Sequence, residues 1–162
     1  MNISQRNAST THAALDAATL LNADHIKFEK WIDQFKLQSD IDQKRTISSD
    51  FIRELYVDME LEARLLLPLL DNVHLLQKIA RTVRDSHLSL QKFITKIQEA
   101  CRNDAFYDEF IYQLGREFRR YRFHEVLVVF PALRENFPAE LATIMVEMQA
   151  LKDELLGGTR PG

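Results

Sequence analysis

Residues 58–70 read DMELEARLLLPLL and place two carboxylates where a helix should bury hydrocarbon. Written as a helix, this part of the chain has one inward-facing seam, at alternating spacings of four and three: Phe51, Leu55, Asp58, Glu62, Leu65 and Leu69. Asp58 and Glu62 lie in the middle of that seam. An ionised carboxylate without a partner costs several kcal/mol in an apolar core. The seam therefore predicts that these two side chains meet a cation, a basic partner or water.

The composition predicts one all-helical globular domain. The chain has 162 residues, of which 46% are hydrophobic and 28% charged, enough for a proper core. Glycine and proline number only four each, and good helix formers dominate. We expect a disordered tail over residues 1–11, a single helical bundle over residues 12–156, and a second disordered tail over residues 157–162.

Charge and cysteine content exclude several classes of function. A net charge of −3 gives no electrostatic case for binding nucleic acid or an anionic membrane. Cys101 is the only cysteine, so an internal disulfide is excluded and a reducing compartment is favoured. The first residues lack the apolar core of a secretory signal, and no apolar run is long enough to cross a bilayer. We expect a soluble, cytoplasmic protein.

The spacing of apolar residues and the positions of capping and helix-breaking residues predict five helices, over about residues 12–38, 44–70, 73–102, 105–134 and 138–155. The first seam carries His25 among apolar residues, the third carries His87, and the fourth carries Tyr121 and Glu125. We expect a cap at Ser9, Thr10 or Thr11 before the first helix. Pro68 should kink or end the second helix, and Cys101 should be a small core residue.

An internal repeat relates the two halves of the chain. Residues 51–70 align without gaps on residues 114–133, which pairs Asp58 with Tyr121, Glu62 with Glu125, and Pro68 with Pro131. His25 aligns with His87 in the helices that precede them. Short connections between the helices predict an up-down-up-down antiparallel four-helix bundle. Such a bundle would bring six residues to one buried level: His25, Asp58, Glu62, His87, Tyr121 and Glu125. Two nitrogen and four oxygen donors suit a pair of non-haem iron or manganese ions.

This order of residues resembles the hemerythrin-like (HHE cation-binding) family over about residues 20–133. The resemblance implies a hemerythrin-like four-helix bundle with an additional C-terminal helix. It also implies a non-haem di-iron cofactor, with or without an oxo or hydroxo bridge, in which Glu62 and Glu125 bridge the metals. His25 and His87 have the expected type, whereas Asp58 and Tyr121 stand where the family has histidine. Ala63 also replaces an acidic residue that is common in the family.

The two replacements change the function that we expect. Carboxylate and phenolate oxygens suit a hard ferric ion, so Asp58 and Tyr121 should lower the reduction potential. We therefore expect handling or sensing of iron, oxygen, nitric oxide or peroxide, with a diatomic molecule or peroxide as ligand, in preference to oxygen transport. A metal-free bundle that acts as a protein-interaction module is the alternative. The sequence leaves open whether the chain is an enzyme and whether it forms a homodimer.

Other polar groups give weaker hypotheses. The basic group Arg116, Arg119, Arg120 and Arg122 is expected to be a solvated helix face, with an anion or partner site as the alternative. His124 is expected to be solvated or interhelical. Histidine phosphotransfer would need an exposed histidine, and the seam predicts that His87 points inward. The sequence has no Gly-rich phosphate loop, nucleophile elbow or Cys-x-x-Cys pair.

Overall fold

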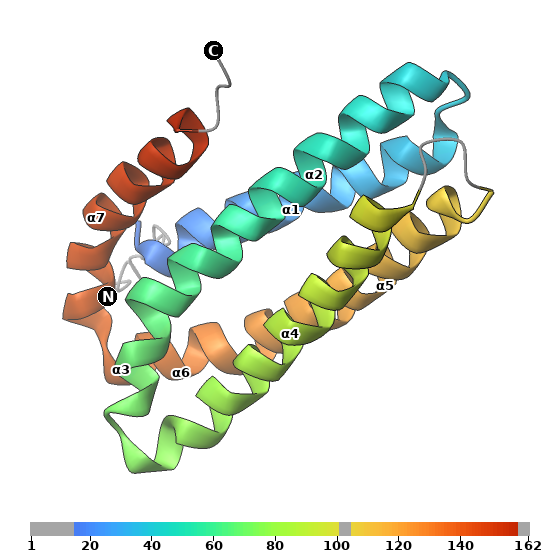
Figure 1. Cartoon of the computed structure of the whole chain (residues 1–162). Helices are drawn as coiled ribbons and strands as arrows, with labels where there is room; N and C mark the ends of the chain where they lie inside the picture. Colours follow the sequence, from blue (N-terminus) through green and yellow to red (C-terminus); the bar gives the residue numbers. More distant parts are fainter. Residues whose placement is uncertain (1–14, 101–104, 159–162) are drawn as a thin grey trace, which may run out of the picture.

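The computed structural model describes residues 15–100 and 105–158, and every regular element in these two ranges is helical. In chain order the elements are α1 (Ala17–Leu37), α2 (Ile41–Leu61), η1 (Glu62–Leu66), α3 (Leu67–Asp71), η2 (His74–Leu76), α4 (Gln77–Glu99), α5 (Tyr107–His124), η3 (Glu125–Val129), α6 (Phe130–Asn136) and α7 (Pro138–Gly157). The segments α2–η1–α3 and α5–η3–α6 are each one continuous helical rod (Figure 1). The predicted all-α class is confirmed.

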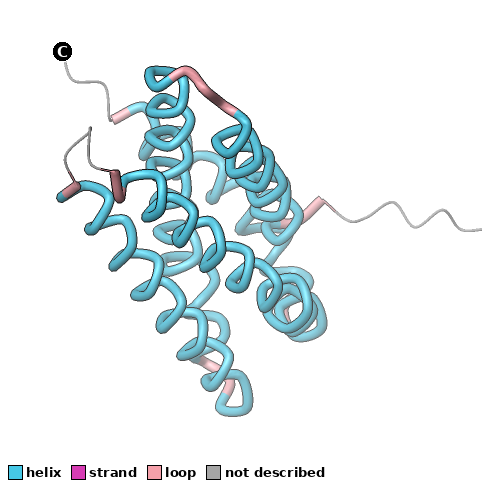
Figure 2. Tube along the Cα trace, turned by 90° about the vertical axis from the view of Figure 1, so that its right-hand side faces the viewer, coloured by secondary structure: helices cyan, strands magenta, loops and turns pink. Residues whose placement is uncertain are grey.

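The helices form the predicted bundle. Helix α1 packs against α2, and α4 packs against α5; α1 also contacts α5 and so joins the two pairs. Helix α7 lies against α1 and α2 as the additional C-terminal helix (Figure 1). A view turned by 90° shows the short connections between neighbouring helices (Figure 2). No helix in the described ranges is long and apolar enough to span a membrane. The expected tail over residues 1–11 and the expected core position of Cys101 lie outside these ranges.

The first helix begins later than the sequence suggested. Its N-cap is Asp16, whose carboxylate accepts a hydrogen bond from the Thr19 backbone N–H at 2.8 Å. The expected cap at Ser9 to Thr11 is therefore wrong. Arg134 donates to the same carboxylate at 3.0 Å, which ties α6 to the start of α1. This pair fixes the end of the bundle at which α1, α6 and α7 meet.

The core contains an aromatic cluster of Phe28, Phe51 and Phe118, whose ring centroids are 5.7 to 5.8 Å apart. All three side chains are buried. The imidazole of His25 contacts both Phe28 and Phe118, at centroid distances of 6.2 and 5.5 Å. On its other side it stacks on Phe130. The level of the bundle that holds His25 is therefore enclosed by aromatic rings.

Both rods contain a π-helical turn where the sequence predicted an ordinary helix. In η1 the Leu67 N–H donates to the Glu62 carbonyl, five residues back, and in η3 the Phe130 N–H donates to the Glu125 carbonyl. Each turn is followed by a proline, Pro68 or Pro131, in the first turn of the next α-helix. The expectation that Pro68 kinks or ends the helix just before Asn72 agrees with the structure, because the π-helical turn interrupts the α-helix before Pro68 and α3 ends at Asp71. Proline has no N–H to donate and crowds the carbonyl four residues back, and a wider turn relieves that conflict.

The π-helical turns shift the buried seam by one residue. The sequence placed Leu65 and Leu69 inward, but Leu66 and Leu70 are the buried ones, with 1% and 0% of their surface exposed. In the second rod Val129 and Leu133 are buried in place of Val128 and Ala132, and Val128 is 38% exposed. A wide turn adds one residue, so every later side chain on that face moves by one position. Before each turn the seam is as predicted from Phe51 and from Leu114 onward, whereas Phe110 is only partly buried and Ile111 is buried in its place.

Candidate metal centre

The six side chains predicted to share one level are all buried. Four rods contribute them: His25 from α1, Asp58 and Glu62 from the α2–η1 junction, His87 from α4, and Tyr121 and Glu125 from the α5–η3 junction. His87 is the most exposed of the six, at 6% of its surface. Glu62 and Glu125 are each the first residue of a π-helical turn. π-Helical turns are frequent at functional sites, and here they mark the two glutamates that the repeat had paired.

The side chains form two imidazole–carboxylate pairs around one phenol. The distance from His25 Nε2 to Asp58 Oδ2 is 3.4 Å, and that from His87 Nε2 to Glu62 Oε2 is also 3.4 Å. Both distances allow electrostatic attraction, but neither nitrogen meets the geometry of a hydrogen bond. The Tyr121 hydroxyl donates a hydrogen bond to Glu62 Oε1. Its ring lies 5.8 Å from the His25 ring and 5.7 Å from the His87 ring, between centroids.

Most donor atoms of this layer have no hydrogen-bond partner among the described residues. These atoms are both nitrogens of His25, Nε2 of His87, and both carboxylate oxygens of Asp58 and of Glu125. Buried polar atoms in proteins are nearly always hydrogen-bonded, and each one that is not costs free energy. Seven unpartnered atoms on four neighbouring side chains therefore need a physical explanation.

Burial dominates the electrostatics of the layer, and its carboxylates add to the effect. Burial raises the pKa of Asp58 to about 7, an effect that the contact with His25 opposes and the charges of Asp24 and Glu62 increase. Burial, and then the charges of Glu62 and Asp58, raise the pKa of Glu125 well above its ordinary range. Burial, and then the charges of Glu125, Glu62 and Asp58, also raise the pKa of Tyr121. A cation bound in the layer would lower all three pKa values.

The donors fit a metal by chemistry, although they do not form a closed ligand set as they lie. No three His, Cys, Asp or Glu side chains in residues 15–100 and 105–158 surround one point closely enough to hold an ion. They meet as the two pairs already described, with Tyr121 between them. Imidazole nitrogens together with carboxylate and phenol oxygens suit iron or manganese. Binding would require the side chains to move, and hydrogen bonds hold only Glu62 and Tyr121 among the six.

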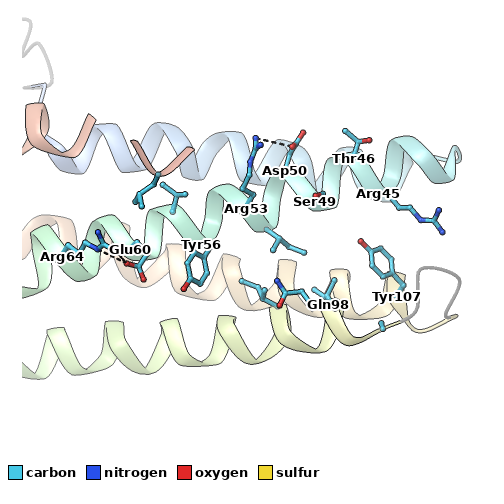
Figure 3. A pocket seen from close by; sticks show the side chains of 16 residues that line it. Arg45, Thr46, Ser49, Asp50, Arg53, Tyr56, Glu60, Arg64, Gln98 and Tyr107 are labelled. Atoms are coloured by element: carbon cyan, nitrogen blue, oxygen red, sulfur yellow. Dashed lines mark hydrogen bonds and ion pairs between the residues drawn. The ribbon is translucent and has the colours of Figure 1, made fainter. Parts of the chain in front are cut away.

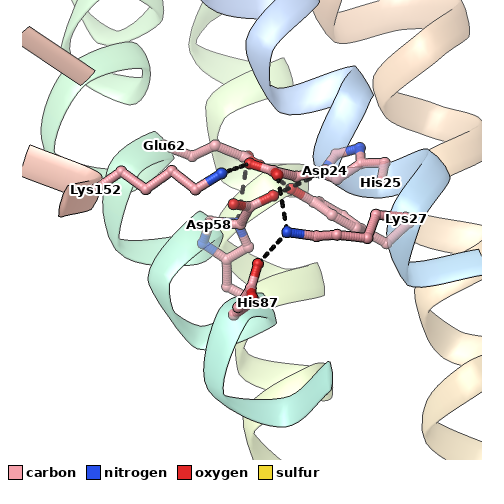
Figure 4. Close-up of polar contacts among 9 residues, drawn as sticks. Asp24, His25, Lys27, Asp58, Glu62, His87 and Lys152 are labelled. Atoms are coloured by element: carbon pink, nitrogen blue, oxygen red, sulfur yellow. Dashed lines mark hydrogen bonds and ion pairs between the residues drawn. The ribbon is translucent and has the colours of Figure 1, made fainter. Parts of the chain in front are cut away.

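Four charged residues beside the layer were not predicted. Asp24 and Lys27 lie on α1, Glu54 on α2 and Lys152 on α7, and their side chains form a chain of ion pairs (Figure 4). Two of them stand next to predicted residues, since Asp24 precedes His25 and Glu54 lies one turn before Asp58. The repeat did contain Glu54, which it aligned with Glu117. Nothing in the sequence singled out Lys152, because only the apolar face of its helix could be recognised.

The other polar residues considered in the sequence analysis, the arginines of α5 and His124, lie away from the layer or at helix contacts. Arg119 binds Asp33 at 2.8 Å and Arg122 binds Glu29 at 2.6 Å, so half of the basic group joins α5 to α1. Arg116 and Arg120 pair with Glu109 and Glu117 of their own helix. His124 is partly buried, and burial lowers its pKa. The expected solvated face therefore holds for only part of the basic group.

A groove of about 1040 Å³ runs between α2 and α4 and contains none of the six residues (Figure 3). Its floor is apolar and includes Ile52, Val57 and Ile94. Three arginines line it, Arg45, Arg53 and Arg64, against two carboxylates, Asp50 and Glu60. The charges along this side of α2 therefore do not favour a cation.

The comparisons with known proteins bear on the fold. No family model and no curated protein matches the sequence of this chain. The structure is similar to that of a hemerythrin HHE cation-binding domain-containing protein from Mycobacterium kansasii, with a TM-score of 0.77 and 15% sequence identity over 90% of each chain. At that identity the likeness concerns the fold alone. The chain therefore has a hemerythrin-like fold, as the resemblance in its sequence implied.

Proposed function

We propose that this chain binds a pair of non-haem metal ions, iron in the first place, in the layer of His25, Asp58, Glu62, His87, Tyr121 and Glu125. The observation that carries the proposal is the set of unpartnered, fully enclosed donor atoms, above all the two carboxylate oxygens of Glu125, whose exposure is 0%. The similar protein from Mycobacterium kansasii is described as containing a cation-binding domain, which supports the same reading. Bound iron would supply one-electron redox chemistry and a position for a small ligand.

The residues of the layer favour iron handling or sensing over oxygen transport. Asp58 and Tyr121 provide oxygen donors where the resemblance implies imidazoles, and anionic oxygens stabilise the ferric state. Phe28, Phe118 and Phe130 surround His25 and exclude water, which strengthens every charge interaction in the layer. We therefore place the chain in iron, oxygen, nitric oxide or peroxide metabolism, with a diatomic molecule or peroxide as the ligand.

Metal content tests the proposal directly. The full chain, purified from iron-supplemented cells, should carry about two iron ions, the number that paired carboxylate–histidine sites in helical bundles hold. Glu125→Gln should lower that content below about one ion per chain, because it removes a buried anion. Glu60→Gln is the matched control, since Glu60 lies on the same rod as Glu62 but pairs with Arg64 near the surface. A folded wild-type chain without iron or manganese would refute the proposal.

A metal-free interaction module is the second candidate. The hydrogen bond from Tyr121 to Glu62 and the two imidazole–carboxylate pairs favour it, because the hydrogen bond gives Glu62 a partner and the pairs allow electrostatic attraction, both without a metal. The metal analysis separates the two candidates, since only this one predicts a folded chain that takes up no metal under any loading condition.

A further inference from the structure

A chain of alternating charges covers the side of the layer at which α1, α2 and α7 meet. The ammonium group of Lys152 binds Asp24 Oδ2, Lys27 Nζ lies 3.3 Å from Asp24 Oδ1, and Lys27 also binds Glu54 Oε2. The side chains of Asp24, Glu54 and Lys152 are only 9%, 13% and 14% exposed. We call Lys152, Asp24, Lys27 and Glu54 the latch (Figure 4). Three of its members are largely sheltered from solvent, whereas the Lys27 side chain is 38% exposed.

The latch stands directly outside the candidate centre. Asp24 precedes His25, and its charge is one cause of the raised pKa of Asp58. Glu54 lies one helical turn from Asp58 on the same face of α2. Behind these two carboxylates are the unpartnered oxygens of Asp58, with 1% of that residue exposed. Two anionic side chains therefore flank an enclosed carboxylate on this side of the layer.

An enclosed metal site needs an access route, and charge decides which side of α2 can provide it. The groove on the α4 side carries more arginines than carboxylates. On the α7 side, Asp24 and Glu54 would attract a cation once their ammonium partners moved away. Clefts lined by one sign of charge raise association rates of oppositely charged ions by about 10- to 1000-fold.

We propose that the latch is the access gate of the metal centre and that Lys152, from the C-terminal helix, controls the rate at which cations enter and leave. With Lys152 on Asp24 the latch is neutral and closed. When Lys152 leaves Asp24, the remaining residues carry one net negative charge, which admits a divalent cation. This inference rests on the proposed function, because it describes how the same centre is filled.

Cobalt(II) uptake by the metal-free full-length chain, followed by its visible absorption, tests the gate. Lys152→Met should speed both uptake and release to a chelator about tenfold, so that the affinity, which is their ratio, changes by less than about threefold. Lys152→Arg should keep wild-type rates. Glu54→Gln should slow uptake about threefold or more, because it leaves the latch with net positive charge. A general loosening of the fold would speed cobalt uptake by both Lys152→Met and Glu54→Gln. Faster uptake by the first variant and slower uptake by the second therefore identify the gate.

Lys44→Met is the matched control. Lys44 also pairs with a carboxylate, Asp108, and its side chain is 17% exposed, but this pair joins α2 to α5 away from the layer. It should leave both rates unchanged. The rate differences of the latch variants should shrink at high ionic strength, since screening weakens electrostatic steering.

Three results would overturn the gate. Equal uptake rates for wild type, Lys152→Met and Glu54→Gln would overturn the gate alone and leave the proposed function standing. A changed affinity at an unchanged uptake rate would assign Lys152 to positioning of the centre. If the wild-type chain takes up no cobalt or iron, the proposed function fails and the gate fails with it.

Discussion

Glu62 and Glu125 occupy equivalent places in the two halves of the bundle, each as the first residue of a five-residue π-helical turn. In both rods a proline follows the turn by two residues, Pro68 after Leu66 and Pro131 after Val129. The repeat is thus a repeat of backbone geometry as well as of residue type. Each glutamate points inward as the helical period before it requires, and the turn then shifts the apolar side chains that follow it by one position.

The shifted register predicts unequal effects for neighbouring leucines. Leu66→Ala should lower the free energy of unfolding by about 2 to 5 kcal/mol, because Leu66 is 1% exposed and its loss leaves a cavity. Leu65→Ala should lower it by less than about 1 kcal/mol, because Leu65 is only partly buried. Urea denaturation of the metal-free variants measures both values. A larger effect at Leu65 would mean that the rod α2–η1–α3 is an uninterrupted α-helix.

The fold and the centre of the candidate site were predictable because they depend on local spacing. His25, Phe28 and Ile32 follow the period of a straight helix, and all three are buried as that period requires. Asp58 and Glu62 stood out for the same reason, since Asp58 precedes the π-helical turn, Glu62 begins it, and only later residues are shifted. The residues predicted to be buried after the turns were wrong by one position, because the prediction assumed 3.6 residues per turn along the whole rod.

The latch could not be predicted in the same way. Its four members come from α1, α2 and α7, and their pairing depends on how α7 lies across the other two helices. Asp24 and Lys152 are separated by 128 positions, and the periodicity of apolar residues gives no information on which charged side chains pair across helices. A single sequence therefore locates the donors of the layer but not the charges around them.

Stability of the metal-free chain should fall as the pH rises from about 4 to about 7. The pKa of Asp58 is about 7 in the folded chain against an ordinary value of 3.8. Between these values the folded state binds one proton more than the unfolded state, so raising the pH favours unfolding. At about 1.4 kcal/mol per pKa unit the full effect is about 4 kcal/mol, and the raised pKa of Glu125 acts in the same direction. Urea denaturation at several pH values measures it.

Asp58→Asn is the control for that pH dependence. The amide cannot ionise, so the decrease in stability between pH 4 and 7 should be smaller by the share that Asp58 contributes. A wild-type chain whose stability rises over this range would contradict the raised pKa of Asp58.

Asp58→Leu should change stability in opposite directions with and without metal. Without metal it removes a buried carboxylate that has no hydrogen-bond partner, so the free energy of unfolding should rise by about 1 to 4 kcal/mol. With metal it removes a donor, so the stabilisation by bound metal should decrease. Thermal unfolding in excess chelator and in excess iron gives the two values. A loss of stability in chelator would show that the pair with His25 outweighs the burial of the charge.

Tyr121→Phe should separate a ligand from a hydrogen-bond donor at the centre of the layer. In the metal-free chain the Tyr121 hydroxyl donates to Glu62, and without it that buried carboxylate loses a partner, which should cost about 1 to 3 kcal/mol of stability.

In the iron-loaded chain a Tyr121 phenolate bound to ferric iron predicts a broad visible charge-transfer band. Tyr121→Phe should abolish that band while iron remains bound through the other donors. Tyr112→Phe is the control, because Tyr112 packs on Phe35, away from the layer. Bound iron without such a band in the wild-type chain would leave Tyr121 as a donor to Glu62 and remove it from the ligand set.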